Sequence, residues 1–376
     1  MHDMRCLVIL QMRDTTFEAH KNDRPLDTYK TGQIFHISPP RFIDVVKRRL
    51  ELSLRELADS APETVRYTTP SGIKISYSKD KSGEFLKLIY LELFQRPTNT
   101  SRILEALAGR NVRKALDMFM AIITSGHMPE DLIATVASGS QTRRLPEYMV
   151  LKILMRQDYR FYNQNSGFIS NIFHSNGNWE RPSNFLVPEI LFYLIGNRKV
   201  NGDNGQMGYV SVSRLIPYLE KFGYVSSDIY DASNYLLNRE LIEADSATTS
   251  IISEDTCIKA SASGWAHMRI LASRSEYLVS ILPTTPLNDN TLDARVFDLM
   301  QVENRFGKIS FNQSNGILDL FYKYLSDQFI TLKSHPGYAD SSVNGAQYII
   351  RKLQEAKRFE HKSQQSATAQ IDWLDS

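Results

Sequence analysis

The chain has little cysteine, no long apolar run and almost no net charge, and each of these shortages excludes a class of protein. Cys6 and Cys257 are the only cysteines and form no CxxC pair, so we predict neither a disulfide framework nor a zinc site. No stretch approaches the roughly 18 apolar residues of a membrane span, and residues 1–14 become charged too soon for a signal peptide. We therefore expect a cytoplasmic protein without a membrane partner.

Patterns that mark common enzymes are also missing. The eight histidines are scattered without H-E-x-x-H or another metal spacing, and no G-x-S-x-G supplies a serine nucleophile. His36 lies in a strand-like stretch, where a packed core histidine is the simpler interpretation. The formal net charge of +2 predicts no particular partner, so nucleic-acid binding would need a local basic patch. We find no independent active site and predict no metal.

The 376 residues are enough for two or three globular domains, and 42% hydrophobic with 23% charged residues is ordinary for such a protein. The patterns predict a mainly α fold with small β elements. We divide the chain into residues 1–40, with strands at 5–12 and 31–38; 41–160, helical with a hairpin at 65–79; 161–285, mixed; 286–360, helical; and 361–376, a polar tail.

Apolar periodicity and turn residues locate the individual elements. In the second region we expect helices at 41–61, 84–95, 100–108, 111–125, 129–137 and 146–156. The polar segment 162–184 marks the next boundary. It is followed by a helix at 187–196, a Gly-rich loop at 201–208, helices at 212–223 and 226–241, strand-like stretches at 241–245 and 255–261, and a helix from Gly264. Three helices followed by a two-stranded ribbon is the winged helix-turn-helix order.

The helix predicted after Gly109 raises the sharpest functional question. Asn111 is a good N-cap, and Arg110, Arg113 and Lys114 crowd the first turn. Because free N–H groups and the macrodipole already make a helix N-terminus positive, each cation there costs roughly a few tenths of a kcal/mol. An anion would relieve this, either a phosphate or a carboxylate from elsewhere in the fold.

Several motifs occur together in a known order. They are a strand ending in "MRD", a second strand, a Pro-Pro break, a long helix, "GRNVRKAL" and the winged-helix pattern. Over about residues 5–272 this resembles the C-terminal two-thirds of a P-loop ATPase of the AAA+ or STAND type. The resemblance implies an ATPase-core remnant at 1–40, a helical lid at 41–160 and a winged helix at 161–285.

The resemblance also implies roles for four cations. Arg13 would stand at sensor 1, and Arg113, with Lys114, would lie on the sensor-2 helix facing the terminal phosphates of the nucleotide. Arg24 would occupy an arginine-finger position, although "KNDRPLD" is also a good exposed turn. The structural alternative for Arg113 and Lys114 is a surface salt bridge to Glu105 or Asp117, and for Arg13 a strand-end ion pair.

The phosphate-binding half of that family pattern is missing from the sequence. There is no G-x-x-x-x-G-K-[ST] and no apolar strand that ends in the acidic pair that would hold magnesium. We therefore expect no ATP hydrolysis and no cofactor for the isolated chain. ATP and magnesium would require a P-loop domain supplied upstream or in trans. A fragment, a split-gene product and a degenerate relative all remain open.

The charge of the predicted recognition helix decides between protein and DNA partners. This helix carries Asp228, Asp231 and Glu240 against Arg239 alone, and the wing is also acidic. A surface facing phosphates is expected to offer several Lys or Arg side chains. We therefore predict a regulatory or interaction region with a protein partner or self-association. The alternatives are a fragment of an intact ATP-hydrolysing protein and a DNA-binding regulator, whose candidate DNA contacts are Arg214, Lys221 and Arg239.

The polar tail contains one large aromatic side chain. Trp373 lies among acidic residues after a Gln- and Ser-rich stretch that is not expected to fold alone. A tryptophan in such a tail is either part of a frayed end or an anchor for a groove on this chain or on a partner.

Overall fold

The computed structural model describes most of the chain from residue 40 onward. The described residues are 12, 17, 20, 22–24, 40–58, 64–68, 74–78, 87, 89–95, 99–109, 111–125, 145–157, 159, 161–165, 167–176, 183–246, 248–301, 311–338, 344–355 and 357–358. Arg13, His36, Arg110, the strands expected at 5–12 and 31–38 apart from Met12, the helix expected at 129–137 and the tail at 361–376 lie outside them.

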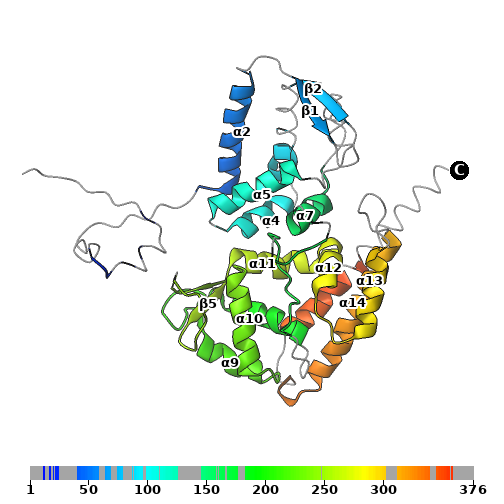
Figure 1. Cartoon of the computed structure of the whole chain (residues 1–376). Coiled ribbons are helices and arrows are strands. Elements are labelled where there is room, and N and C mark those ends of the chain that lie inside the picture. The colour runs from blue at the N-terminus through cyan, green and yellow to red at the C-terminus, as the bar shows by residue number, and fades with distance from the viewer. Residues whose placement is uncertain are drawn as a thin grey trace, which may run out of the picture.

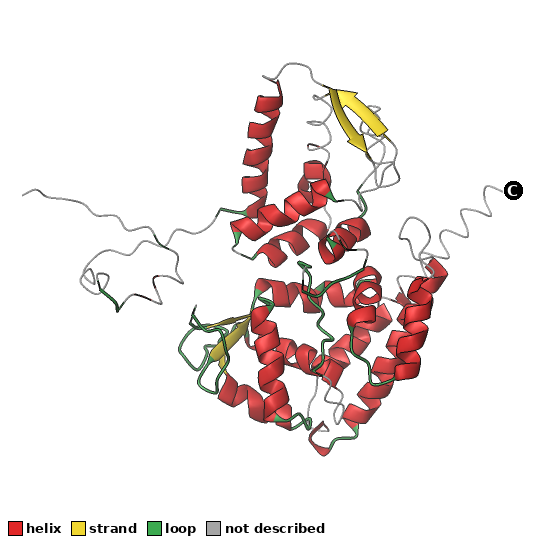
Figure 2. Ribbon diagram, viewed as in Figure 1, coloured by secondary structure: helices red, strands yellow, loops and turns green. Residues whose placement is uncertain are grey.

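The protein is mainly helical, as the sequence predicted, and it contains a small three-stranded antiparallel sheet where a two-stranded ribbon was expected. The helices form two tiers (Figure 1, Figure 2). The upper tier contains α2 (Phe42–Ala58), α4 (Asn99–Ala108), α5 (Val112–Thr124) and α7 (Glu147–Arg156). The lower tier contains α8 (Leu186–Asn197), α9 (Val212–Glu220), α10 (Ser226–Asn238), α11 (Ala262–Arg269), α12 (Ser275–Ile281), α13 (Asn290–Gln301), α14 (Phe311–Lys333) and a helix at 345–355.

The upper tier follows the local sequence patterns closely. On α2, Phe42, Val46 and Leu50 recur every four residues and are buried, and the ring of Phe42 meets that of Phe94 edge to face at 5.2 Å. The expected hairpin is present, because β1 (Thr64–Thr68) pairs antiparallel with β2 (Lys74–Ser78). Of the helix expected at 84–95, the structure describes residues 87, 89 and 90 as α-helix and Leu91–Gln95 as a π-helical turn.

The lower tier contains a unit in which four helices pack against the three-stranded sheet. Its order along the chain is α8, β3 (Val210–Ser211), α9, α10, β4 (Ile242–Ala244), β5 (Cys257–Ala260) and α11. The strands lie in the order β3–β5–β4, and both pairings are antiparallel. The helices and the two longer strands were predicted, whereas the two-residue β3 was not.

Glycine allows α11 to approach the turn before β4 closely. A Cβ atom at Gly264 would lie 2.1 Å from the carbonyl oxygen of Leu241, a distance that no side chain can occupy. Ser261 caps this helix, since its Oγ accepts the N–H of Gly264 at 3.0 Å. The α11 helix therefore packs directly on the sheet unit that precedes it.

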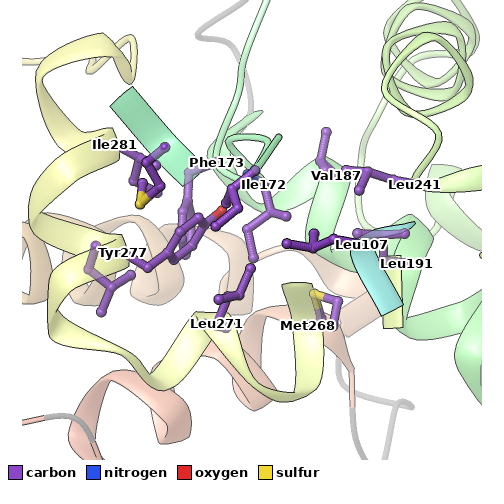
Figure 3. Packing of buried hydrophobic residues seen from close by; sticks show 14 of the residues in the cluster. Leu107, Ile172, Phe173, Val187, Leu191, Leu241, Met268, Leu271, Tyr277 and Ile281 are labelled. Carbon is purple, nitrogen blue, oxygen red and sulfur yellow. The ribbon is translucent and has the colours of Figure 1, made fainter. Parts of the chain in front are cut away.

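An irregular segment, residues 167–176, runs through the core of the lower tier, and we call it the core strap. Ile169, Ile172 and Phe173 are fully buried, and Figure 3 shows Ile172 and Phe173 among Tyr277, Ile281 and other apolar side chains. The polar sequence at 162–184 had suggested a boundary between domains, and that boundary remains a prediction. The burial of the strap itself is unlike that of an exposed linker.

Buried irregular backbone needs hydrogen-bond partners, and side chains of the lower tier supply them. The hydroxyl of Tyr277 donates to the carbonyl of Ser170 at 2.8 Å and accepts the N–H of Ile172 at 3.0 Å. The Nε2 atom of His267 accepts the N–H of Ser170 at 2.9 Å. The Asn171 carbonyl accepts the hydroxyl of Tyr235 at 2.8 Å. These bonds fix the strap to α10, α11 and α12.

The helix at 345–355 is joined to α8 by a buried carboxylate. Both oxygens of Glu189, which is fully buried, accept backbone N–H groups at 2.8 Å, one from Gly345 and one from Ala346. These N–H groups belong to the first turn of the later helix, where intrahelical partners are lacking. A Cβ atom at Gly345 would lie 2.7 Å from the carbonyl oxygen of Pro188, so this contact also depends on glycine.

Within the described part of the chain, no helix has both the length and the apolar character needed to cross a membrane.

Candidate interaction site at helices α5 and α10

The N-terminus of α5 has the capped form that the sequence predicted. The Oδ1 atom of Asn111 accepts the backbone N–H of Lys114 at 3.1 Å. Arg113 points from the exposed face of the helix, whereas Lys114 is largely buried, with a side chain 18% exposed. The two cations at this end of the helix therefore have different environments.

Lys114 has an anionic partner within the protein. Its Nζ atom lies 2.6 Å from the Oε2 atom of Glu240, which follows α10. Glu240 adopts a positive φ of 55°, and its carbonyl accepts the hydroxyl of Ser261 at 2.7 Å. The sequence had left a phosphate and a distant carboxylate as candidates for this helix end. For Lys114 the structure places a carboxylate there, and it is Glu240 instead of the nearby Glu105 or Asp117.

We predict a small but measurable coupling between Lys114 and Glu240. Because the Glu240 side chain is 62% exposed, solvent screens the pair, and the coupling free energy should be about 0.5 kcal/mol. The measurement is a double-mutant cycle of Lys114→Met and Glu240→Gln, read from urea unfolding.

The matched control for this cycle pairs Lys114→Met with Asp117→Asn, which removes a carboxylate one turn away on α5. That pair should show no coupling. Coupling to Asp117 without coupling to Glu240 would contradict the observed geometry.

Further contacts dock the upper tier on the lower one. Helix α4 packs against α11, and α7 packs against α12. Figure 3 shows Leu107 of α4 in one cluster with Leu191 of α8 and Met268 of α11. Arg274, at the start of α12, forms a 3.0 Å ion pair with Glu147, the first residue of α7. The Lys114–Glu240 pair therefore lies at the edge of a broad, mainly apolar contact.

The exposed face of α10 carries no cation. Its solvent-facing stripe contains Ser227, Asp231 and Asn238, and the intervening Asn234 accepts the N–H of Ile252 through its Oδ1 atom at 2.8 Å. Such a stripe offers no positive charge to a phosphate backbone.

The three DNA-contact candidates do not form a shared free surface. The Nη2 atom of Arg239 donates to the Oδ1 atom of Asn165 at 2.8 Å, and its guanidinium lies 5.7 Å from the ring centroid of Tyr235. Arg214 lies 3.5 Å from Asp203. Lys221 is exposed. Two of the three cations are thus engaged by neighbouring side chains.

The loop between β4 and β5 is acidic and exposes the apolar side chain of Ile251. Asp245, Glu254 and Asp255 are exposed, and the side chain of Ile251 is 74% exposed. An exposed aliphatic residue among carboxylates is more typical of a protein contact than of a nucleic-acid contact.

A small cavity of about 110 Å³ lies beside α10, lined by residues of the core strap, α8 and α10. Asp228 lies at its wall and accepts the Nδ2 group of Asn176 at 3.1 Å. His174 also lines the cavity, stacks on Tyr235 at 4.2 Å and has its pKa lowered by burial and by Arg239. No group of three or more potential metal ligands occurs in the portion of the chain that the structure describes.

The structure describes only some of the cations to which the resemblance assigns nucleotide contacts. Arg13 lies outside the described residues, and Arg24 lies in an exposed turn. Among the described sensor candidates, Arg113 is exposed and Lys114 is paired with Glu240. These two cations do not make a nucleotide site by themselves.

Comparisons with protein-family models, with curated proteins and with solved structures each found no match.

Sequence reasoning identified the cations of the site but missed their partners. In the sequence, Glu240 stands out only as an acidic residue of the predicted recognition helix, and no pattern singles out Asn165. Lys114 and Glu240 are 126 positions apart, and no periodicity or capping pattern connects residues over that distance.

Proposed function

We propose that residues 186–269 form a winged helix-turn-helix unit that acts as a protein-interaction module. The order of α8, β3, α9, α10, β4 and β5, with the sheet order β3–β5–β4, supports this assignment. We favour a protein partner over DNA because the exposed stripe of α10 is acidic or neutral along its length. The upper tier would then correspond to the lid of an AAA+ or STAND ATPase, docked on the module through α4 and α5.

A regulatory role follows from the way the module is held. The C-terminal end of α10 contacts both α5, through Glu240, and the segment before the core strap, through Arg239. A partner that bound this corner would have to displace intramolecular contacts. A nucleotide would have to be held mainly by a P-loop domain elsewhere, because Arg113 and Lys114 alone do not fit that role.

DNA binding is the second candidate function, and only the order of elements supports it. We expect the protein to bind duplex DNA weakly and without sequence preference, with a Kd of about 1 µM or weaker at physiological salt. The measurement is fluorescence anisotropy of labelled duplexes over a range of salt concentrations. As a positive control, Asp231→Lys with Asn238→Lys places two cations on the exposed stripe of α10 and should strengthen nonspecific binding.

One result would reverse this ranking. It is nanomolar, salt-dependent DNA binding by the unmodified protein that is largely lost in Lys221→Ala or Arg239→Ala.

A further inference from the structure

Three cations gather around one aromatic ring in the lower tier. The ring is that of Tyr348, in the helix at 345–355, and its side chain is almost fully buried. The guanidinium carbon of Arg269, at the end of α11, lies 4.7 Å from the ring centroid. The corresponding distances are 5.4 Å for Arg351 and 5.7 Å for the Nζ atom of Lys352.

The charges of this cluster are not balanced within the described chain. Lys352 forms an ion pair with Glu355 at 2.6 Å. No carboxylate of a described residue pairs with Arg269 or Arg351. Three cations and one carboxylate therefore leave a net charge of +2. The ring attracts each cation through its quadrupole but carries no net charge, so it holds the cations in place without neutralising them.

We propose that Arg269, Arg351 and Lys352 form a binding site for a phosphate group, either free phosphate or a small phosphate monoester. A phosphate monoester carries a charge of roughly −1.5 to −2 at neutral pH, which matches the charge of the cluster. Guanidinium groups bind phosphate oxygens through paired N–H donors. Phe192 packs on Tyr348 with a centroid distance of 5.6 Å and fixes the ring that orders the cations.

This site is separate from the cations at the start of α5. It lies on α11 and the helix at 345–355, and it requires neither a nucleotide nor a winged-helix partner. Because the Tyr348 ring is buried, a nucleobase has no face on which to stack, and recognition would be limited to the phosphate group.

The test is isothermal titration of the full chain with inorganic phosphate and, separately, with phenyl phosphate, at an ionic strength held constant with sodium chloride. We expect binding by the unmodified protein. In Arg351→Gln the affinity should fall about tenfold or more, because one charge-assisted hydrogen-bond donor is lost. The matched control is Arg295→Gln, which removes an exposed arginine from α13 and should leave the affinity unchanged.

The two ligands distinguish the sources of phosphate, since tighter binding of phenyl phosphate indicates an ester and equal or weaker binding indicates the free ion. Arg351 is exposed, so its substitution should not impair folding, and thermal unfolding in chloride verifies this. The proposal is overturned if neither ligand binds more tightly than chloride, or if Arg351→Gln and Arg295→Gln bind phosphate equally well.

Discussion

Replacing Glu189 by alanine is expected to lower the free energy of unfolding by about 3 kcal/mol, because it leaves two buried N–H groups without acceptors. These are the N–H groups of Gly345 and Ala346, both of which now donate to the carboxylate at 2.8 Å. The loss should appear in urea unfolding as a lower midpoint. Glu254→Ala, which removes an exposed glutamate from the loop before β5, is the matched control and should change stability by less than about 0.5 kcal/mol.

Glu189 also makes stability depend on pH. Burial raises its pKa from 4.5 to about 7, although the N–H groups of Ala346 and Gly345 act in the opposite direction. The folded state then retains a proton that the unfolded state has released. The stabilisation from this linkage is complete below about pH 4.5 and is lost as the pH rises through about 7.

Glu189→Gln separates the two effects, because it keeps one acceptor oxygen and cannot ionise. Its stability should vary less than that of the unmodified protein between pH 4.5 and 7. Equal stability of Glu189→Ala and the unmodified protein at every pH would show that the carboxylate does not cap the helix at 345–355.

Replacing His267 by phenylalanine is expected to cost about 3 kcal/mol, because the new ring has a similar shape but no acceptor for a buried N–H group. The imidazole is fully buried, with Nε2 accepting the N–H of Ser170 at 2.9 Å. Its Nδ1 atom lies 2.7 Å from the carbonyl of Ser263, so it carries the proton and donates it there. The measurement is again urea unfolding. His267→Gln should retain more stability, since its side-chain oxygen can accept the Ser170 N–H.

The pH dependence from His267 has the opposite direction to that from Glu189. Burial lowers the pKa of His267 from 6.5 to about 4, and Lys114 adds to this shift. Below the ordinary pKa of histidine, the imidazole is therefore protonated in the unfolded chain but stays neutral in the folded chain. The stabilisation is present above about pH 6.5 and is lost as the pH falls toward 4. In the His267→Gln variant, the free energy of unfolding should fall less as the pH is lowered. If it falls as steeply as in the unmodified protein, the assignment to His267 is wrong.

The local architecture of the upper tier could be predicted from the sequence to within a few residues. Helix α2 follows from the spacing of Phe42, Val46 and Leu50, and the start of α5 follows from Asn111 as an N-cap. The hairpin at β1 and β2 follows from alternation around a turn. All three signals act between residues up to four positions apart or across one tight turn, so a single sequence contains them completely.

The candidate site could be predicted only in part. The sequence identified Lys114 as a cation in need of an anion, and it identified α10 as a helix without a cation, but of the carboxylates counted on its exposed face Asp228 is buried. The choice of Glu240 as the anion depended on how α10 and β4 dock beside α5. The hydrogen bond from Arg239 to Asn165 forms because the segment before the core strap lies beside the end of α10. Neither docking is specified by local periodicity.

The sequence by itself determined the mainly helical class, the position of most helices and the absence of a phosphate-binding loop motif. Only the tertiary structure decided that the polar strap is buried, that Glu189 caps a helix 156 positions away, and that cations from α11 and the helix at 345–355 meet at Tyr348. The physical reason is the range of the interactions. Helix and turn formation depends on neighbours in the chain, whereas burial and the choice of polar partners depend on which apolar faces pack together, and many faces of similar composition compete for each contact.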